Sequence, residues 1–252
     1  MLFSLRIDET GTDGRSRFTT IGGAVATAEQ WDGLEAAWQR KLDDKGVAAF
    51  HLKEFDQREP PFAGWSKMKR ELFERGLWKS VNEHVLFRSA ISIDSAAHSS
   101  VKDRMRGIKG FSPDSDYGLC FRYLMFAACE QLVIVDPDCQ LSIIAEAGPW
   151  ASGAAVTYKK VAAMQGRWKP AKHAHRLAGF AALPKGHIRS LEAADFIVGR
   201  EHERLVANRR AEKRDKVLSH LLSESDLEIW YQGMMREKDA RRDFNRTQKS
   251  ST

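Results

Sequence analysis

The sequence predicts an α/β protein with a mixed five-stranded sheet flanked by helices and with extra helices at the C-terminus. An opening pair of strand patterns, separated by the glycine-bearing loop 10–14, predicts an antiparallel hairpin. Strand and helix patterns then alternate, which favours parallel pairing. The length of 252 residues fits one domain with additions. We expect this domain to span 1–208, with a helical insertion at about 27–84 and a charged helical extension at 209–252.

The first half of the chain is expected to contain three strands and two helices. The strands predicted from alternating or continuous apolar residues are 2–8, 18–26 and 85–93. Thr27 is expected to cap a helix that Gly46 ends, and Ser66 is expected to cap a second helix. The apolar stripes of these helices are Trp31, Leu34, Ala37, Trp38 and Leu42, and then Leu72, Phe73, Leu77 and Val81. The interval 47–65 is expected to be a loop.

Helix and strand patterns alternate in the second half of the chain. Residues 95–113 are polar and contain glycine, which predicts another loop. A long helix is expected to start at Asp114 or Ser115 and to end before Pro137. The next expected elements are a strand at 139–145, a helix at 152–165, a strand at 175–183 and a helix capped by Ser190. Beyond about residue 208, helices are predicted from the apolar residues Leu218, Leu221, Leu222, Leu227, Ile229, Trp230 and Met234.

Composition excludes several classes of protein. A hydrophobic fraction of 42% and a charged fraction of 29% exclude disordered, collagen-like and fibrous chains. No window reaches the roughly 18 uncharged apolar residues that a membrane helix needs. The apolar start is broken by Arg6 and followed by Asp8 and Glu9, unlike a secretory signal. We therefore expect a cytoplasmic protein without a membrane partner. Its cysteines lack metal or redox spacing and are expected to be buried thiols: Cys120, Cys129 and Cys139.

Positive charge is concentrated in residues 147–191, although the net charge of the chain is only +6. This interval contains no acidic residue, and aromatic and histidine residues lie between its positive charges. Such a pattern is typical of a surface that contacts phosphates and stacks bases. We expect it to bind nucleic acid, either DNA or RNA, and the alternative is a solvated helix face. The basic residues are Lys159, Lys160, Arg167, Lys169, Lys172, Arg176, Lys185 and Arg189.

Acidic residues fall at the ends of two predicted strands and in one predicted helix. Asp8 ends the first strand, Glu146 ends the fourth, and Asp195 lies in an apolar helix where a lone carboxylate is costly to bury. Because ligands bind beyond the carboxyl ends of strands in open α/β sheets, we expect these acids to converge. Carboxylates are preferred ligands of Mg²⁺ and Mn²⁺, and one or two such ions can activate water for phosphodiester cleavage. An acid at a strand end can also simply form a turn or pair with a lysine.

Other polar residues are secondary candidates. Glu192 shares a helical face with Asp195 and is a possible ligand, but as a first-turn acid it can also serve the helix dipole. Glu9 is expected to point to the opposite face from Asp8, and is a weaker ligand candidate. Asp94, at the end of the third strand, is a reserve ligand. The remaining candidates are His51 as a substrate contact or a satisfied polar side chain, and His202 at the site rim or exposed to solvent.

Four short segments resemble those of a known family. They are Ile7-Asp8-Glu9-Thr10-Gly11, Ile21-Gly22-Gly23-Ala24, Phe50-His51, and Leu191-Glu192-Ala193-Ala194-Asp195-Phe196-Ile197. In order and spacing they resemble the bacterial and phage family called domain of unknown function 3800. This resemblance covers roughly residues 3–205 and implies a ribonuclease-H-like fold. Thr10 stands where the family usually has serine, and Glu192 stands where it usually has glutamine.

These observations favour a metal-dependent nuclease or nuclease-like protein that acts on nucleic-acid phosphodiesters. In this hypothesis Asp8, Glu146 and Asp195 hold one or two Mg²⁺ or Mn²⁺ ions. One alternative is a non-catalytic module of the same fold that binds nucleic acid or, through the C-terminal helices, a protein partner. Another is a phosphotransferase, because Asp8-Glu9-Thr10-Gly11-Thr12 resembles the phosphate loop of actin- and hexokinase-like enzymes.

Overall fold

A computed structural model describes residues 1–249, except residues 15, 110, 165–168, 185 and 208–216. The described residues form an α/β protein with a mixed six-stranded sheet in the order β5-β4-β1-β2-β3-β6. Strands β1, β2 and β3 pair antiparallel, whereas β4 and β5 follow β1 in parallel and β6 is parallel to β3. The strands are β1 (Leu2–Thr10), β2 (Phe18–Thr27), β3 (Phe87–Asp94), β4 (Gln140–Glu146), β5 (Leu177–Leu183) and β6 (Val217–Leu222).

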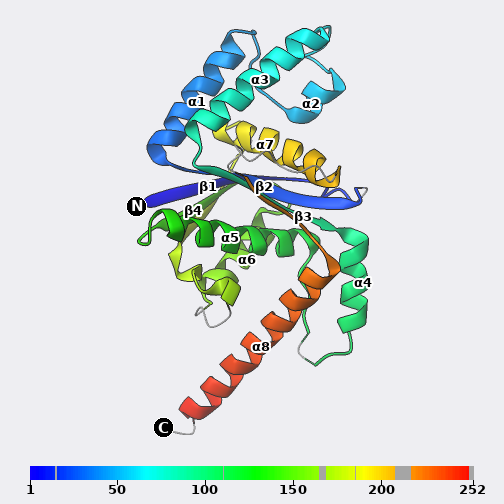
Figure 1. Cartoon of the computed structure of the whole chain (residues 1–252), viewed down its shortest axis with the longest axis vertical. Helices are drawn as coiled ribbons and strands as arrows, with labels where there is room; N and C mark the ends of the chain where they lie inside the picture. Colours follow the sequence, from blue (N-terminus) through cyan, green and yellow to red (C-terminus); the bar gives the residue numbers. More distant parts are fainter. Residues whose placement is uncertain (15, 110, 165–168, 185, 208–216, 250–252) are drawn as a thin grey trace.

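Helices cover both faces of the sheet (Figure 1). On one face lie α1 (Ala28–Asp43), α2 (Leu52–Gln57), α3 (Lys67–His84) and α7 (Arg189–Val206). On the other lie α4 (Ser95–Met105), α5 (Asp116–Val135), α6 (Ala151–Ala162) and α8 (Glu224–Lys249). Two short 3₁₀ helices, η1 (Lys169–Ala171) and η2 (Ala174–Arg176), precede β5. The expected helical insertion corresponds to α1, α2 and α3, which lie between β2 and β3.

Side-chain alternation along β1 divides the core in two. Phe3, Leu5 and Ile7 are buried in the cluster that contains α5. The side chains that alternate with them along β1, ending with Asp8, therefore face α7. The second cluster lies between α1, α3 and α7, where Trp38 and Phe196 meet with ring centroids 5.9 Å apart. The polar side chains at the end of β1 thus have a covering helix on each side.

The capping residues determine where several helices begin. Thr27 forms a capping box with Gln30 at the start of α1, as its position predicts. Ser66 and Ser115 accept hydrogen bonds from the backbone N–H groups of Lys69 and Gly118, at 3.2 and 3.0 Å. Expectation and structure agree at these three positions because the cap bonds involve residues only three positions apart.

Ser190 was expected to cap a helix, and this expectation is wrong. Ile188 is the N-cap of α7 and makes no side-chain cap bond. Ser190 instead lies buried inside the helix, where its hydroxyl donates to Glu35 Oε1 at 2.7 Å and accepts from Arg6. Leu72 is also corrected, because it is 55% exposed and does not belong to the buried stripe of α3.

The sheet contains one strand more than expected. Leu218, Leu221 and Leu222 have helical spacing, yet Val217–Leu222 forms β6 and pairs with β3 from Arg88 to Ile93. The edge of β3 would otherwise present a row of unpaired backbone groups, and β6 pairs with them. Tertiary pairing therefore overrides the helical pattern, and the C-terminal extension is not purely helical.

Both expected loops contain helices. Residues 52–57 form α2 within the interval 47–65, and residues 95–105 form α4 within 95–113. Asp94 caps α4 by accepting from the N–H groups of Ala96 and Ala97, at 2.9 and 3.2 Å. Helix α4 buries one face through His98 and Val101, a spacing hidden by its polar composition.

Helix α5 is the apolar helix of the core. It is long and apolar enough to cross a membrane by length and composition, but 61% of the apolar window is buried against the protein. Its packing against the sheet therefore accounts for its composition. Cys120 and Cys129 lie buried on this helix and Cys139 lies buried just before β4, and all three are free thiols as expected.

Gly23 allows β1 and β2 to approach closely. A Cβ atom at this position would lie 1.8 Å from the backbone oxygen of Arg6. Gly23 pairs with Ile7, the residue that precedes Asp8. Any side chain at position 23 would therefore displace the strand end that carries Asp8.

Candidate functional site

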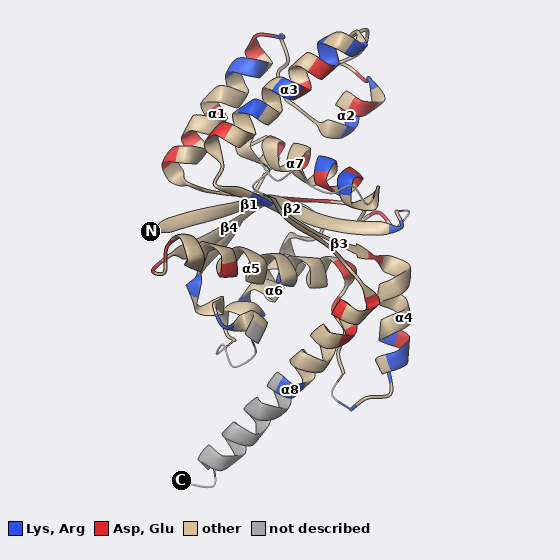
Figure 2. Ribbon diagram, in the orientation of Figure 1, with Lys and Arg blue, Asp and Glu red and all other residues tan. Residues whose placement is uncertain are grey.

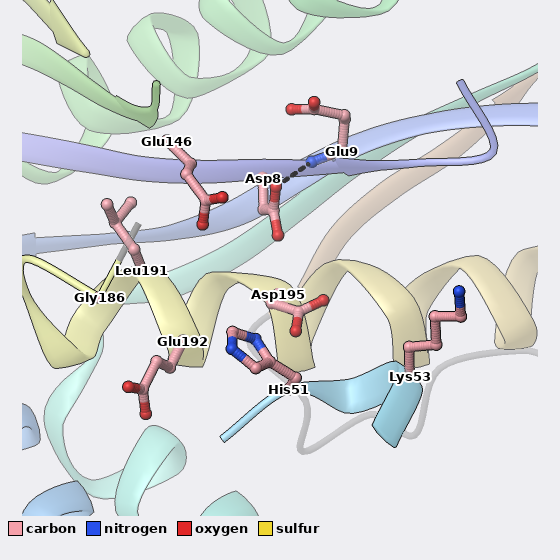
Figure 3. A pocket seen from close by; sticks show the side chains of 9 residues that line it. All are labelled: Asp8, Glu9, His51, Lys53, Glu146, Gly186, Leu191, Glu192 and Asp195. Atoms are coloured by element: carbon pink, nitrogen blue, oxygen red, sulfur yellow. Dashed lines mark hydrogen bonds between the residues drawn. The ribbon is translucent and has the colours of Figure 1, made fainter. Parts of the chain in front are cut away.

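A pocket of about 240 Å³ lies at the carboxyl ends of β1 and β4 (Figure 3). The strands contribute Asp8, Glu9 and Glu146, whereas α7 contributes Asp195. The other lining residues are His51, Lys53, Gly186, Leu191 and Glu192. The structure thus brings together the three acids expected to converge.

Strand register places Asp8 and Glu146 side by side. Ile7 pairs with Ala145 in the parallel β1–β4 ladder, so the next residue of each strand reaches the same edge and the same face. Figure 3 shows the Asp8 and Glu146 side chains on the side of α7 and the Glu9 side chain on the opposite side of β1. The Glu9 backbone N–H donates to Asp8 Oδ1 at 2.8 Å. The expectation that Glu9 points away from Asp8 agrees with this geometry.

Asp195 connects the pocket to α2. Its Oδ2 accepts a hydrogen bond of 2.9 Å from the backbone N–H of Leu52, the first residue of α2. A carboxylate at a helix N-terminus is favoured by the unpaired N–H groups there. This contact fixes the start of α2 against α7 and places His51 and Lys53 on the wall of the pocket.

Glu192 is buried and engaged by other parts of the protein. Its Oε2 accepts from Trp38 Nε1 at 3.1 Å and from the Phe50 backbone N–H at 3.2 Å. Its Oε1 accepts from Arg189 in an ion pair. Figure 3 shows its carboxylate pointing away from Asp8 and Glu146. We therefore interpret Glu192 as the anchor of α1 and of the segment before α2, and not as a metal ligand.

Burial and neighbouring acids raise the pKa values of Asp8 and Glu9. Burial raises the pKa of Asp8 well above its usual range, and the charges of Asp195, Glu9 and Glu146 add to the effect. Burial, followed by the charge of Glu146, raises the pKa of Glu9 to about 7. Within the described part of the chain, no lysine, arginine or histidine forms an ion pair with Asp8, Glu9 or Glu146. A bound cation would favour the ionised forms of these carboxylates.

The acids are not a ready-made metal site. Among the residues that the structure describes, no group of three histidine, cysteine, aspartate or glutamate side chains is already arranged to hold a metal ion. Asp8, Glu146 and Asp195 nevertheless line one pocket and offer only oxygen atoms. This donor set fits Mg²⁺ or Mn²⁺ in kind.

Three sequence candidates lie elsewhere. Asp94 caps α4 and pairs with Arg17 Nε at 2.7 Å, so it serves the start of a helix. His202 is half-buried, and its Nδ1 lies 2.7 Å from Thr20 Oγ1. Thr10 ends β1 and pairs with Thr20. None of the three lines the acidic pocket.

The basic segment does not border the pocket as a continuous track. Lys159 and Lys160 lie in the last turn of α6, on the side of the sheet opposite α7 (Figure 2). Arg176 directly precedes β5, whose first residue pairs with Leu141, five residues before Glu146 along β4. At about 3.3 Å per residue, this places the backbone of Arg176, one residue further back, about 20 Å from the acidic edge.

Two further basic positions are paired with acids. Lys172 Nζ pairs with Glu130 at 3.4 Å, and Arg189 pairs with Glu192. Arg167, Lys185 and the side chain of Lys169 lie outside the described residues.

Lys53 is the site residue that sequence reasoning missed. It lines the pocket from α2, two residues after His51. The signal was present in Phe50-His51-Leu52-Lys53, because a short helix that begins with these residues puts both side chains near its N-terminus. The expectation of a loop over 47–65 concealed this arrangement.

Comparison of the chain with protein-family models, with curated proteins and with solved structures finds no match. The function must therefore be inferred from the chemistry of the pocket and from its place in the fold.

Proposed function

We propose that this chain is a metal-dependent nuclease or nuclease-like protein that acts on nucleic-acid phosphodiesters. One observation carries the proposal: Asp8, Glu146 and Asp195, from two neighbouring parallel strands and a covering helix, line one pocket at the carboxyl edge of the sheet. Acids gathered there from distant parts of the chain are typical of a ligand site in an open α/β sheet.

The sheet supports a ribonuclease-H-like core. Along the chain, the antiparallel strands β1, β2 and β3 come first, and β4 and β5 then add in parallel on the other side of β1. The resulting spatial order is β5-β4-β1-β2-β3. This order agrees with the fold implied by the sequence resemblance, and β6 is an addition at the far edge.

The three acids would hold Mg²⁺ or Mn²⁺, with Glu9 close by on the other face of β1. A bound ion of this kind supplies an activated water and stabilises the leaving oxygen of a phosphodiester. The raised pKa of Asp8, caused by burial and then by its acidic neighbours, fits a site that binds positive charge.

The wall of the pocket provides the complementary groups. Lys53 offers a positive charge for a substrate phosphate, and His51 offers a side chain that can accept or donate a proton. The bond from the Leu52 N–H orients the Asp195 carboxylate toward the pocket. In this proposal Lys53 binds the phosphate, the Leu52 N–H orients the metal ligand Asp195, and His51 transfers a proton.

The test uses the full chain with Mn²⁺ or Mg²⁺ and single-stranded, double-stranded and hybrid substrates. We expect Asp8→Asn and Asp195→Asn to lose both Mn²⁺ binding, measured by calorimetry, and cleavage. Asp94→Asn is the matched control, because this strand-end acid lies outside the pocket and asparagine preserves its helix cap.

Several results would contradict the proposal. Cleavage of no substrate by the wild-type chain, or equal cleavage by Asp8→Asn and Asp195→Asn, would refute it. Binding of nucleic acid without Mn²⁺ binding would instead support a non-catalytic module, and binding of ATP would support the phosphotransferase alternative.

A further inference from the structure

Trp150 and Tyr117 form a stacked aromatic pair beside the acidic pocket. Their ring centroids are 5.3 Å apart and their planes differ by 11°. Tyr117 is only 5% exposed, whereas Trp150 is half-buried. The accessible aromatic surface of the pair therefore belongs to Trp150, which is backed by a ring fixed in the core.

The pair lies at the same edge of the sheet as the acids. Trp150 follows Glu146 by four residues, so their Cα atoms are at most about 14 Å apart. Tyr117 is the second residue of α5, which covers the face toward which Glu9 points. Burial raises the pKa of Tyr117, and the charges of Glu9 and Asp8 raise it further, as expected for a phenol close to the pocket.

Hollows border this pair. One has a volume of about 330 Å³, and its lining includes Trp150, Tyr117, Thr12, Ser16 and Ser115. A neighbouring hollow of about 440 Å³ shares Trp150, Tyr117 and Ser115. The first lies directly beyond the end of β1, because Gly11 and Thr12 form part of its wall.

The chemistry of the first hollow matches a planar heterocycle. An aromatic ring offers a stacking surface that accepts any base, because every base has a π-face. The hydroxyl of Thr12, and that of Ser115, which already accepts from the Gly118 N–H, can contact the polar edge of a base. The Ser16 hydroxyl is bonded to the Phe18 backbone, and the lining also includes Lys102 and Asp116, which pair at 3.7 Å.

We propose that Trp150 is the stacking platform for an unpaired nucleobase next to the cleaved phosphodiester. This inference rests on the proposed function and specifies its substrate class as single-stranded or locally unpaired nucleic acid. A base within an intact duplex is stacked on both sides, so it must leave the helix to contact Trp150.

The experiment measures binding of labelled short oligonucleotides to the full chain by fluorescence anisotropy, in EDTA and in Ca²⁺. The probes are a single strand, the matching duplex and a single strand of the same length without bases. Base–aromatic stacking contributes about 1–3 kcal/mol per base. Trp150→Ala should therefore weaken single-strand binding by about 5- to 150-fold, at about 1.4 kcal/mol per ten-fold.

The other probes and variants isolate the stacking contribution. Trp150→Phe retains an aromatic face and should weaken binding by less than Trp150→Ala. The strand without bases should bind the wild-type chain and Trp150→Ala equally. Trp65→Ala is the matched control, because Trp65 is a half-buried tryptophan on the face that carries α3. Trp65→Ala should bind the oligonucleotides like the wild-type chain. Thermal melting first confirms that each variant folds.

The outcomes separate this inference from the proposed function. Wild-type single-strand binding by Trp150→Ala would overturn the base site and leave the nuclease proposal standing. Equal loss of duplex and single-strand binding would also overturn it, because stacking on an unpaired base would not explain that result. No binding of any oligonucleotide would overturn both, as would Trp150-dependent binding of ATP alone. Trp150-dependent binding without cleavage would support the base site and refute hydrolysis.

Discussion

Replacing Glu192 tests whether this acid anchors the fold or binds metal. Its carboxylate accepts hydrogen bonds from the indole N–H of Trp38 and the backbone N–H of Phe50, and all three residues are buried. Glu192→Ala would leave both donors without an acceptor in a dry environment. We therefore expect a large loss of stability.

The magnitude follows from the two orphaned donors. A buried hydrogen-bonding group left unpaired costs about 1–3 kcal/mol, so Glu192→Ala should lower the free energy of unfolding by about 2–6 kcal/mol. That is a large part of the roughly 5–15 kcal/mol that stabilises a typical protein. Glu192→Gln retains an acceptor oxygen and loses mainly the ion pair with Arg189, whose side chain is 27% exposed. The Glu192 side chain is only 4% exposed, so the loss of its charge is felt in a largely buried position, and we expect that variant to lose about 1–3 kcal/mol.

Urea unfolding and Mn²⁺ calorimetry on the same preparations provide the assay. Glu192→Gln should bind Mn²⁺ like the wild-type chain, whereas Asp195→Asn should not. If Glu192→Gln unfolds like the wild-type chain but loses Mn²⁺ binding, Glu192 is a ligand and our interpretation is wrong. A loss below about 0.5 kcal/mol for Glu192→Ala would equally refute the assigned hydrogen bonds.

Other features of the structure lead to separate predictions. Burial lowers the pKa of His202 below its usual 6.5. The unfolded chain therefore binds a proton at His202 more readily than the folded chain does. The free energy of unfolding is unaffected by this proton above pH 6.5 and decreases as the pH falls below that value towards the lowered pKa. Urea unfolding across pH should show a flatter dependence for His202→Gln. Gly23→Ala should prevent normal folding, visible as a lost or much lower thermal transition, because its Cβ would meet the Arg6 backbone oxygen. If the basic segment contacts nucleic acid, each lost contact should lower the salt slope of log affinity by about 0.7–0.9, and an unchanged slope would identify a solvated face. The residues to replace with glutamine together are Lys159, Lys160 and Lys172.

The acids at strand ends could be predicted because their position depends on local patterns. An apolar run that ends in Asp8 or Glu146 indicates both the strand and its last residue, and parallel pairing brings such ends together. Asp195 could be predicted because a carboxylate in an apolar helix requires a partner. The partner itself, the Leu52 N–H, could not be predicted, since the pairing spans 143 positions.

The elements that the sequence did not predict depend on distant contacts. Helix α2 has only six residues, too few for a periodic pattern to identify it. Strand β6 forms because β3 offers it an edge, which no local spacing reveals. The basic segment is continuous in sequence, but β5 begins at the end of the sheet opposite the acids, so Arg176, which directly precedes β5, is separated from the pocket.

If the pocket binds a cation, the bond between Asp195 and Leu52 would link occupancy of the pocket to the order of α2. A helix of six residues cannot hold itself together in water, so it depends on its contacts with α7. A cation that draws electron density from the Asp195 carboxylate weakens that carboxylate as an acceptor for the Leu52 N–H. By thermodynamic reciprocity, a change in the stability of α2, which carries His51 at its start and Lys53, must then change the affinity for the cation. The rate of amide hydrogen exchange at Leu52, compared with and without the cation, would measure this coupling and would therefore report whether the pocket is occupied.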